Sequence, residues 1–150
     1  MYYGDEVGEI GAPGRPDGDL AMRRSINLAA ALGDGEKMDV VKATSQLCSL
    51  RTSHEALRDA SSAQIPLAHT NTTMAFARVA SSGASAIVAF NCEGQQASMT
   101  LPVSEKMNGV GDGVEFFEPL AGNTGIYVSG GTLTVDLPPN GFRVLIRAGQ

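Results

Sequence analysis

Aromatic and basic residues are scarce in this chain. It has no tryptophan, aromatic residues make up 5% of its 150 positions, and 11 Lys and Arg residues face 16 Asp and Glu residues. The formal net charge is −5 at pH 7. A nucleic-acid partner requires a basic surface that contacts phosphates. The composition therefore predicts no nucleic-acid partner.

Long apolar runs are also missing. No window approaches the ~18 apolar residues that a membrane-spanning helix needs. The N-terminus has no basic region followed by an apolar run, which a secretory signal would show. We therefore predict no membrane partner, and the sequence indicates no cellular compartment.

Cysteines and histidines are few. Cys48 falls in a helical pattern and Cys92 follows an apolar strand, so two buried thiols are favoured over a disulfide. His54 and His69 have no Cys or acidic partner at metal-ligand spacing, so no metal site is predicted. We expect His54 in or beside the core. Gly109-x-Gly111-x-Gly113 is a turn rather than a dinucleotide fingerprint, so no cofactor is predicted.

Glycine, by contrast, is abundant, with 18 residues, and it divides the chain into segments. From Gly4 to about Gly35 the sequence is rich in Gly, Pro and Asp, and only Leu20–Leu32 has a helical composition. A long glycine-punctuated stretch of this kind is typical of a functional loop or of a loose end.

The next segment, Glu36–Asp59, has the clearest helical pattern. Asp34 can cap its amino end, and Glu36 suits the helix dipole. Apolar and boundary positions recur at spacings of three and four along one face: Val40, Ala43, Leu47, Leu50, His54 and Leu57. This stripe must pack against the β segment that follows or against a part of the protein outside this sequence.

The remaining segment, Ala63–Gln150, has the pattern of an all-β domain. Short alternating or apolar runs are separated by turn signals such as Ser82-Gly83, Gly130-Gly131 and Asn140-Gly141. This spacing predicts an antiparallel β-sandwich. The predicted strands are Ile65–His69, Met74–Val79, Ala86–Asn91, Ala97–Leu101, Val114–Glu118, Ile126–Val128, Thr132–Leu137 and Phe142–Arg147.

The first six residues, Met1-Tyr2-Tyr3-Gly4-Asp5-Glu6, look like the carboxyl end of a buried strand that opens into a loop. The body of such a strand would lie before Met1. We therefore expect the sequence to be the C-terminal piece of a larger protein.

Five motifs occur in the order that resembles the C-terminal part of α-amylase-family glycoside hydrolases. The opening, Tyr2–Gly8, is similar to the end of the eighth barrel strand. The next motif, Gly14-Arg15-Pro16-Asp17 followed by Arg23-Arg24, resembles the family's Gly-Lys/Arg-Pro-Asp…Arg-x-Pro-Met loop. In this sequence Ser25-Ile26 stands in place of Pro-Met. Leu47–Arg58 resembles the last barrel helix. The segments Ala75–Asn91 and Leu133–Gly141 resemble the first strands and the closing turn of the C-terminal β domain.

The resemblance implies a mainly β chain in two parts. Residues 1–60 would be the remnant of the end of a (β/α)₈ barrel, a loop plus its last helix, and residues 61–150 a C-terminal antiparallel β-sandwich. The whole enzyme would be a retaining hydrolase acting on α-glucan or maltooligosaccharide. Its nucleophilic Asp, acid/base Glu and supporting Asp would lie on earlier barrel strands, so no catalytic residue is expected in this chain, which would need the missing barrel as its partner.

Two residues of the glycine-rich loop are the candidates for sugar contact. Asp17 and Arg23 place an acceptor and a forked donor on one loop, which can bind vicinal hydroxyls of a glucose unit. Arg24 is the alternative to Arg23, and a solvated loop without sugar contact is the plainer interpretation. Asp5 and Glu6 are neighbours in an extended segment and point to opposite sides, so a structural role is favoured for them.

A free-standing β-sandwich carbohydrate-binding or interaction module is the alternative function. Such modules usually present exposed aromatic side chains to the sugar. Most aromatic residues of the β segment alternate with polar residues and are expected to face inward, which weakens this alternative: Phe76, Phe90, Phe116, Phe117, Tyr127 and Phe142.

Overall fold

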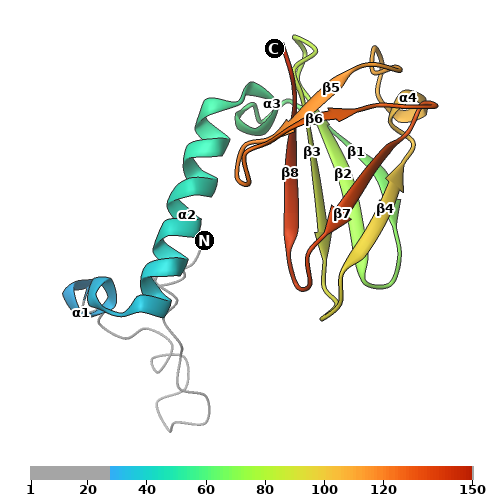
Figure 1. Cartoon of the computed structure of the whole chain (residues 1–150). Helices are drawn as coiled ribbons and strands as arrows, with labels where there is room; N and C mark the ends of the chain where they lie inside the picture. Colours follow the sequence, from blue (N-terminus) through green and yellow to red (C-terminus); the bar gives the residue numbers. More distant parts are fainter. Residues whose placement is uncertain (1–27, 150) are drawn as a thin grey trace, which may run out of the picture. The chain divides into compact units, whose positions relative to one another are not determined.

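The computed structural model describes residues 28–149, which form four helices and eight strands (Figure 1). The helices are α1 (Leu28–Gly33), α2 (Gly35–Ser53), α3 (Glu55–Arg58) and α4 (Val103–Lys106). The strands are β1 (Ala63–His69), β2 (Thr73–Val79), β3 (Ser85–Asn91), β4 (Ala97–Leu101), β5 (Glu115–Glu118), β6 (Asn123–Tyr127), β7 (Leu133–Leu137) and β8 (Phe142–Arg147). The chain divides into two compact units between Ser49 and Leu50. The domain boundary at residue 60 stays a prediction.

In the first unit, α2 begins as the sequence predicts. The Asp34 carboxylate accepts hydrogen bonds from the backbone N–H groups of Glu36, at 3.0 Å, and Lys37, at 3.3 Å. It thereby satisfies two of the donors that a helix start leaves unpaired. Val40 and Leu47, two members of the predicted apolar stripe, are exposed.

The prediction of one continuous helix from Glu36 to Asp59 is wrong at His54. The backbone of His54 is extended, with φ −117° and ψ 121°, and separates α2 from α3. Its carbonyl oxygen accepts hydrogen bonds from the N–H groups of Leu57 and Arg58, which starts the new turn. A sequence pattern does not reveal this break, because the apolar spacing continues across it.

Eight strands form two antiparallel sheets, which confirms the eight predicted strand segments. The larger sheet has the order β1-β2-β3-β8-β5-β6, and β4 pairs with β7 in a two-stranded sheet. The small sheet contacts β1, β2, β3 and β8. The short helix α4, between β4 and β5, is not among the elements predicted from sequence.

The main core lies between the two sheets. Alternation along each strand sends every second residue inward, so both sheets contribute to one cluster, together with Val103 and Met107 at α4. Phe116 is the largest of its fully buried side chains. Its other buried members are Leu67, Ala75, Ala77, Ile87, Ala89, Met99, Leu101, Val110, Val128, Leu133, Val135, Leu137 and Leu145.

A second cluster covers part of the outer face of the six-stranded sheet. Ala86 of β3 pairs in register with Ile146 of β8, and both are buried under Leu50 and Ala56. Val144, Leu57 and Phe117 complete the contact. The sheet is therefore apolar on both faces, and the end of α2 together with α3 covers one region of its outer face.

Arg78 of β2 fastens α3 to the sheet. Its Nε donates to the carbonyl oxygen of Ala56 at 2.9 Å, and its Nη2 donates to that of Asp59 at 2.7 Å. These carbonyl groups lie at the end of a four-residue helix, where no further helical N–H can reach them. The Asp59 carbonyl oxygen also accepts from the N–H of Ser62, at 3.2 Å. One forked side chain thus bonds both carbonyl groups and fixes the place of the helix end on β2.

The turn after α3 is held by Asp59. Its carboxylate accepts hydrogen bonds from the backbone N–H and the hydroxyl of Ser61, each at 2.8 Å. The backbone hydrogen bond of Ser61, with its hydroxyl and the nearby charges of Arg78 and Arg58, lowers the pKa of Asp59 below its ordinary value of 3.8.

The turn between β7 and β8 requires particular residues. Asn140 has φ 45°, the one positive φ outside glycine among residues 28–149. A Cβ atom on Gly141 would lie 2.6 Å from Cγ of Pro138, so a larger residue does not fit there. The buried side chain of Asn91 donates to the carbonyl oxygens of Gln95 and Pro138, which joins this turn to the end of β3.

Both cysteines are exposed, so the expectation of two buried thiols is wrong. Cys92 follows Asn91, the last residue of β3, whose side chain is the one that points inward. The next side chain therefore faces solvent. Cys48 lies on the exposed face of α2.

We predict that the β domain needs the end of α2 and α3 for full stability. A chain that begins at residue 50 should unfold at the same urea concentration as the whole chain. A chain that begins at residue 61 should be roughly 2–5 kcal/mol less stable, because it exposes Ala86, Val144 and Ile146 and removes the acceptors of Arg78. Equal stability of the two shortened chains, followed by circular dichroism, would contradict the role given to α3.

Replacing Arg78 should have an effect of its own. Arg78→Met should lower the free energy of unfolding by about 2 kcal/mol, because it removes two hydrogen bonds from a charged donor and leaves the Ala56 carbonyl group unsatisfied. The Asp59 carbonyl oxygen keeps its hydrogen bond from the Ser62 N–H. Arg51→Met is the matched control: Arg51 is exposed on α2, and its loss should change stability by less than about 0.5 kcal/mol. Urea unfolding of both variants tests the difference.

The decrease in the free energy of unfolding at acidic pH should depend on Asp59. A pKa that is lower in the folded state gives stability that is present above pH 3.8 and is lost as the pH falls through the folded value. The difference in unfolding free energy between the wild-type chain and Asp59→Asn should therefore shrink in that range. Carbon-detected NMR titration of the Asp59 carboxyl group should give a midpoint below 3.8; a midpoint at or above this value contradicts the assignment.

Candidate functional site

The sugar-contact candidates from the sequence lie outside the described residues. Asp17, Arg23 and Arg24, like Asp5 and Glu6, precede residue 28. Their roles stay predictions, and the described part of the chain brings none of them together with another group.

Within residues 28–149 no three or more His, Cys, Asp or Glu residues are grouped so that they could hold a metal ion. No helix in this range is long and apolar enough to cross a membrane. Two hollows in the β domain are left as candidate sites.

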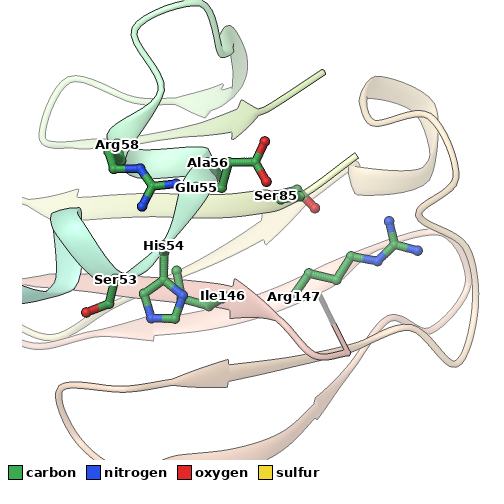
Figure 2. A pocket seen from close by; sticks show the side chains of 9 residues that line it. Ser53, His54, Glu55, Ala56, Arg58, Ser85, Ile146 and Arg147 are labelled. Carbon is green, nitrogen blue, oxygen red and sulfur yellow. The ribbon is translucent and has the colours of Figure 1, made fainter. Parts of the chain in front are cut away.

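The first hollow lies where α3 meets the sheet and has a volume of about 220 Å³ (Figure 2). His54, Glu55 and Arg58 line it from the helical side, and Ser85 and Arg147 are among the residues that line it from the strands. The imidazole of His54 stands edge-on to the ring of Phe117, with 6.2 Å between the centroids and 62° between the planes. His54 is half-buried, as expected for a histidine beside the core.

The two arginines of this first hollow make hydrogen bonds to the backbone. Arg58 Nη1 donates to the carbonyl oxygen of Thr52 at 3.3 Å, and Arg147 Nη2 donates to that of Gly109 at 2.9 Å. In Figure 2 the guanidinium of Arg147 extends away from the imidazole of His54. The cations are therefore directed at backbone carbonyls, and the hollow is best described as the seam between α3 and the sheet.

The second hollow is a groove of about 430 Å³ at the open edge of the sandwich, and we call it the edge groove. It lies between β6, at the end of the larger sheet, and β7, at the edge of the smaller one. Its lining residues are Glu118, Asn123, Thr124, Ile126, Thr134, Val135, Asp136, Arg143 and Leu145.

An ion pair with a buried carboxylate lies at the edge groove. Arg143 Nη1 is 3.0 Å from Oε1 of Glu118, whose side chain is only 4% exposed, and Asn123 Nδ2 donates to Oε2 at 2.9 Å. Arg143 Nε also donates to the carbonyl oxygen of Asp136 at 3.2 Å. A buried carboxylate that is held from two sides is oriented for positioning and binding.

Sequence reasoning missed this ion pair, although strand alternation contains a signal for it. Glu118 is two residues after the inward-facing Phe116, and Arg143 is two residues before the inward-facing Leu145. Both charged side chains therefore belong to the inner face. Two inward charges of opposite sign on different strands are expected to pair, but the sequence does not say that β5 and β8 are neighbours.

The prediction that most aromatic residues face inward is wrong. Only Phe116 lies in the core between the sheets; alanines at positions 75, 77 and 89 take the inward sites beside Phe76 and Phe90. The register aligns Met74 of β2 with Phe90 of β3 and Phe142 of β8 on the outer face. We call these three residues the aromatic row, after the two phenylalanines. Met74 and Phe142 are exposed, as is Tyr127 on β6. Alternation alone could not reveal the orientation, because both faces of the sheet are apolar.

The fold of this chain also occurs in solved protein structures. No protein-family model matches the chain, and no curated protein matches it. Solved structures do match, with the correspondence in their C-terminal part. An α-amylase from Geobacillus thermoleovorans, solved with acarbose, matches all of this chain with a TM-score of 0.77 and 18% sequence identity, over 29% of its own length.

Two more solved structures have a similar fold. An α-amylase from Anoxybacillus matches all of the chain with a TM-score of 0.73 and 23% identity, over 29% of its length. A debranching enzyme from Nostoc punctiforme matches 97% of the chain with a TM-score of 0.65 and 21% identity, over 27% of its length. The chain thus spans less than a third of the solved structures that it matches. The mainly β fold predicted from the sequence, a helix followed by antiparallel sheets, is that of the C-terminal part of these α-amylase-family enzymes.

Proposed function

We propose that the chain is the C-terminal part of an α-glucan-acting glycoside hydrolase, in which it supports a catalytic barrel. The observation that carries this proposal is the structural match of the whole chain to about 29% of two α-amylases. The five motifs described above occur in the same order along the chain, which adds support that is independent of the coordinates.

The outer face of the six-stranded sheet is consistent with a large partner such as a barrel. The end of α2 and α3 cover Ala86, Val144 and Ile146, whereas the aromatic row on the same face has exposed members. Exposed apolar side chains that continue an existing packing surface are typical of an interface with a larger body. The apolar outer face gives such a body a place to dock.

In this proposal the chemistry belongs to the barrel. Retaining hydrolysis needs a nucleophilic carboxylate and an acid/base carboxyl about 5 Å apart across the sugar. The resemblance assigns both groups to earlier strands. Asp17 and Arg23, on the loop after the last barrel strand, would contact a glucose unit of α-glucan or maltooligosaccharide from the rim.

We predict that the purified chain has no hydrolytic activity on starch, maltooligosaccharides or pullulan. Loss of a single catalytic group costs several orders of magnitude in rate, and here both carboxylates would be missing. Reducing-end assays test this directly. Turnover that survives purification and is lost in Asp5→Asn or Glu6→Gln would contradict the proposal.

A rescue experiment tests the partner. An α-amylase that is truncated before its matching C-terminal part should regain stability or activity when the chain is added. Phe142→Asp, on the aromatic row, should weaken the rescue by about tenfold or more, because it places a charge in the apolar contact. Thr100→Asp is the matched control, since Thr100 is exposed on β4 of the other sheet. Equal effects of the two substitutions would remove the aromatic row from the interface.

A further inference from the structure

The unequal size of the two sheets creates the edge groove. The two-stranded sheet packs over β1, β2, β3 and β8, and the inner face of the larger sheet continues beyond it to β5 and β6. At this place the inward side chains are not all apolar: Glu118 of β5 and Arg143 of β8 point into the space between the sheets. The groove therefore combines an open mouth with fixed polar groups.

Two polar groups at the edge groove have hydrogen-bonding capacity left. Arg143 uses Nε and Nη1, and its Nη2 meets no acceptor within residues 28–149. Asn123 uses Nδ2, and its Oδ1 meets no donor in the same range. One donor and one acceptor thus stand beside a carboxylate that is already held in place. Such preorganised groups lose little entropy when a ligand binds.

The charges of the edge groove favour a neutral ligand. Glu118 and Arg143 cancel each other, and Asp136, which also lines the groove, leaves a negative balance that disfavours anions. The described residues contain no cluster for a metal ion. Ile126, Val135 and Leu145 add apolar wall. A donor and an acceptor beside apolar carbon match a ring that carries hydroxyl groups on a hydrocarbon frame.

A peptide strand fits the edge groove less well. Strand addition needs an edge with unpaired backbone groups. On β7 the carbonyl oxygen of Asp136 is already bonded to Arg143, and on β6 Gly125 has φ 73°, which interrupts the regular strand. Both edges are therefore partly blocked for pairing with another chain.

We propose that the edge groove binds a neutral polyhydroxy ligand, a sugar of one or two units, with Nη2 of Arg143 donating to one hydroxyl and Oδ1 of Asn123 accepting from a neighbouring one. The inference does not rest on the proposed function, because the groove is complete without a barrel. It assigns a sugar contact to the β domain, in addition to the one predicted for Asp17 and Arg23. With one open side, the groove should bind weakly, with Kd on the order of millimolar.

NMR titration of the ¹⁵N-labelled chain with glucose and maltose tests the proposal. We expect saturable amide shifts at Asn123, Thr124, Asp136 and Arg143, and binding of the anionic analogue glucuronate at least about threefold weaker than that of glucose. Shifts confined to the seam of Figure 2, equal binding of glucuronate, or no saturable shift up to about 0.1 M sugar would each overturn the proposal. This map needs no variant, so it decides the case even where a substitution disturbs folding.

A matched pair of variants adds a second test. Arg143→Lys keeps a charge opposite Glu118 but loses the forked donor, and should weaken sugar binding about tenfold. Arg147→Lys, the same change at the seam beside α3, should leave the affinity unchanged. Sugar binding that is equally strong in Arg143→Lys and the wild-type chain would overturn the role of Arg143. Activity assays on the whole enzyme are not involved, so failure here is distinct from failure of the proposed function.

Discussion

One sheet of the β domain has six strands and the other has two, and this mismatch decides where the core is closed and where it is open. Two strands cannot cover six, so the small sheet is placed over β1, β2, β3 and β8, and β5 and β6 extend beyond it. Val103 and Met107 at α4 contribute to the core on the side of β1. On the side of β6 no element of the described chain closes the gap. There an ion pair takes the place of apolar packing.

The outer face of the six-stranded sheet is apolar in part, which is unusual for an antiparallel sheet. Antiparallel sheets commonly have one packed and one solvated face, and their strands then alternate between apolar and polar residues. Here Phe76, Val88 and Val144 face outward, while the alanines at positions 75, 77 and 89 face inward. Only part of this outer face is covered by Leu50, Ala56 and Leu57. The rest of this outer face keeps exposed apolar side chains, Met74 and Phe142 among them.

Much of the fold could be predicted from the sequence, because turns and strand alternation are local signals. All eight strands, the cap at Asp34 and the turn at Asn140-Gly141 follow from residues close together in the chain. The break at His54 and the reach of Arg78 to Ala56 could not be predicted, since they depend on contacts between distant segments. The pairing of Glu118 with Arg143 depends on β5 lying beside β8, which alternation does not specify. The candidate residues Asp17 and Arg23 lie outside the described range, so for them the sequence is the sole basis.

Strand β8 contributes side chains to two different surfaces of the β domain. Its residues alternate: Phe142, Val144 and Ile146 face outward, where the apolar outer face is, and Arg143 and Leu145 face inward, toward the edge groove and the core. A body that covers the outer face therefore contacts none of the inward side chains. Occupation of the groove by a sugar likewise requires no change on the outer face. The period of two along a single strand thus separates docking from binding, and the two proposals can hold or fail independently.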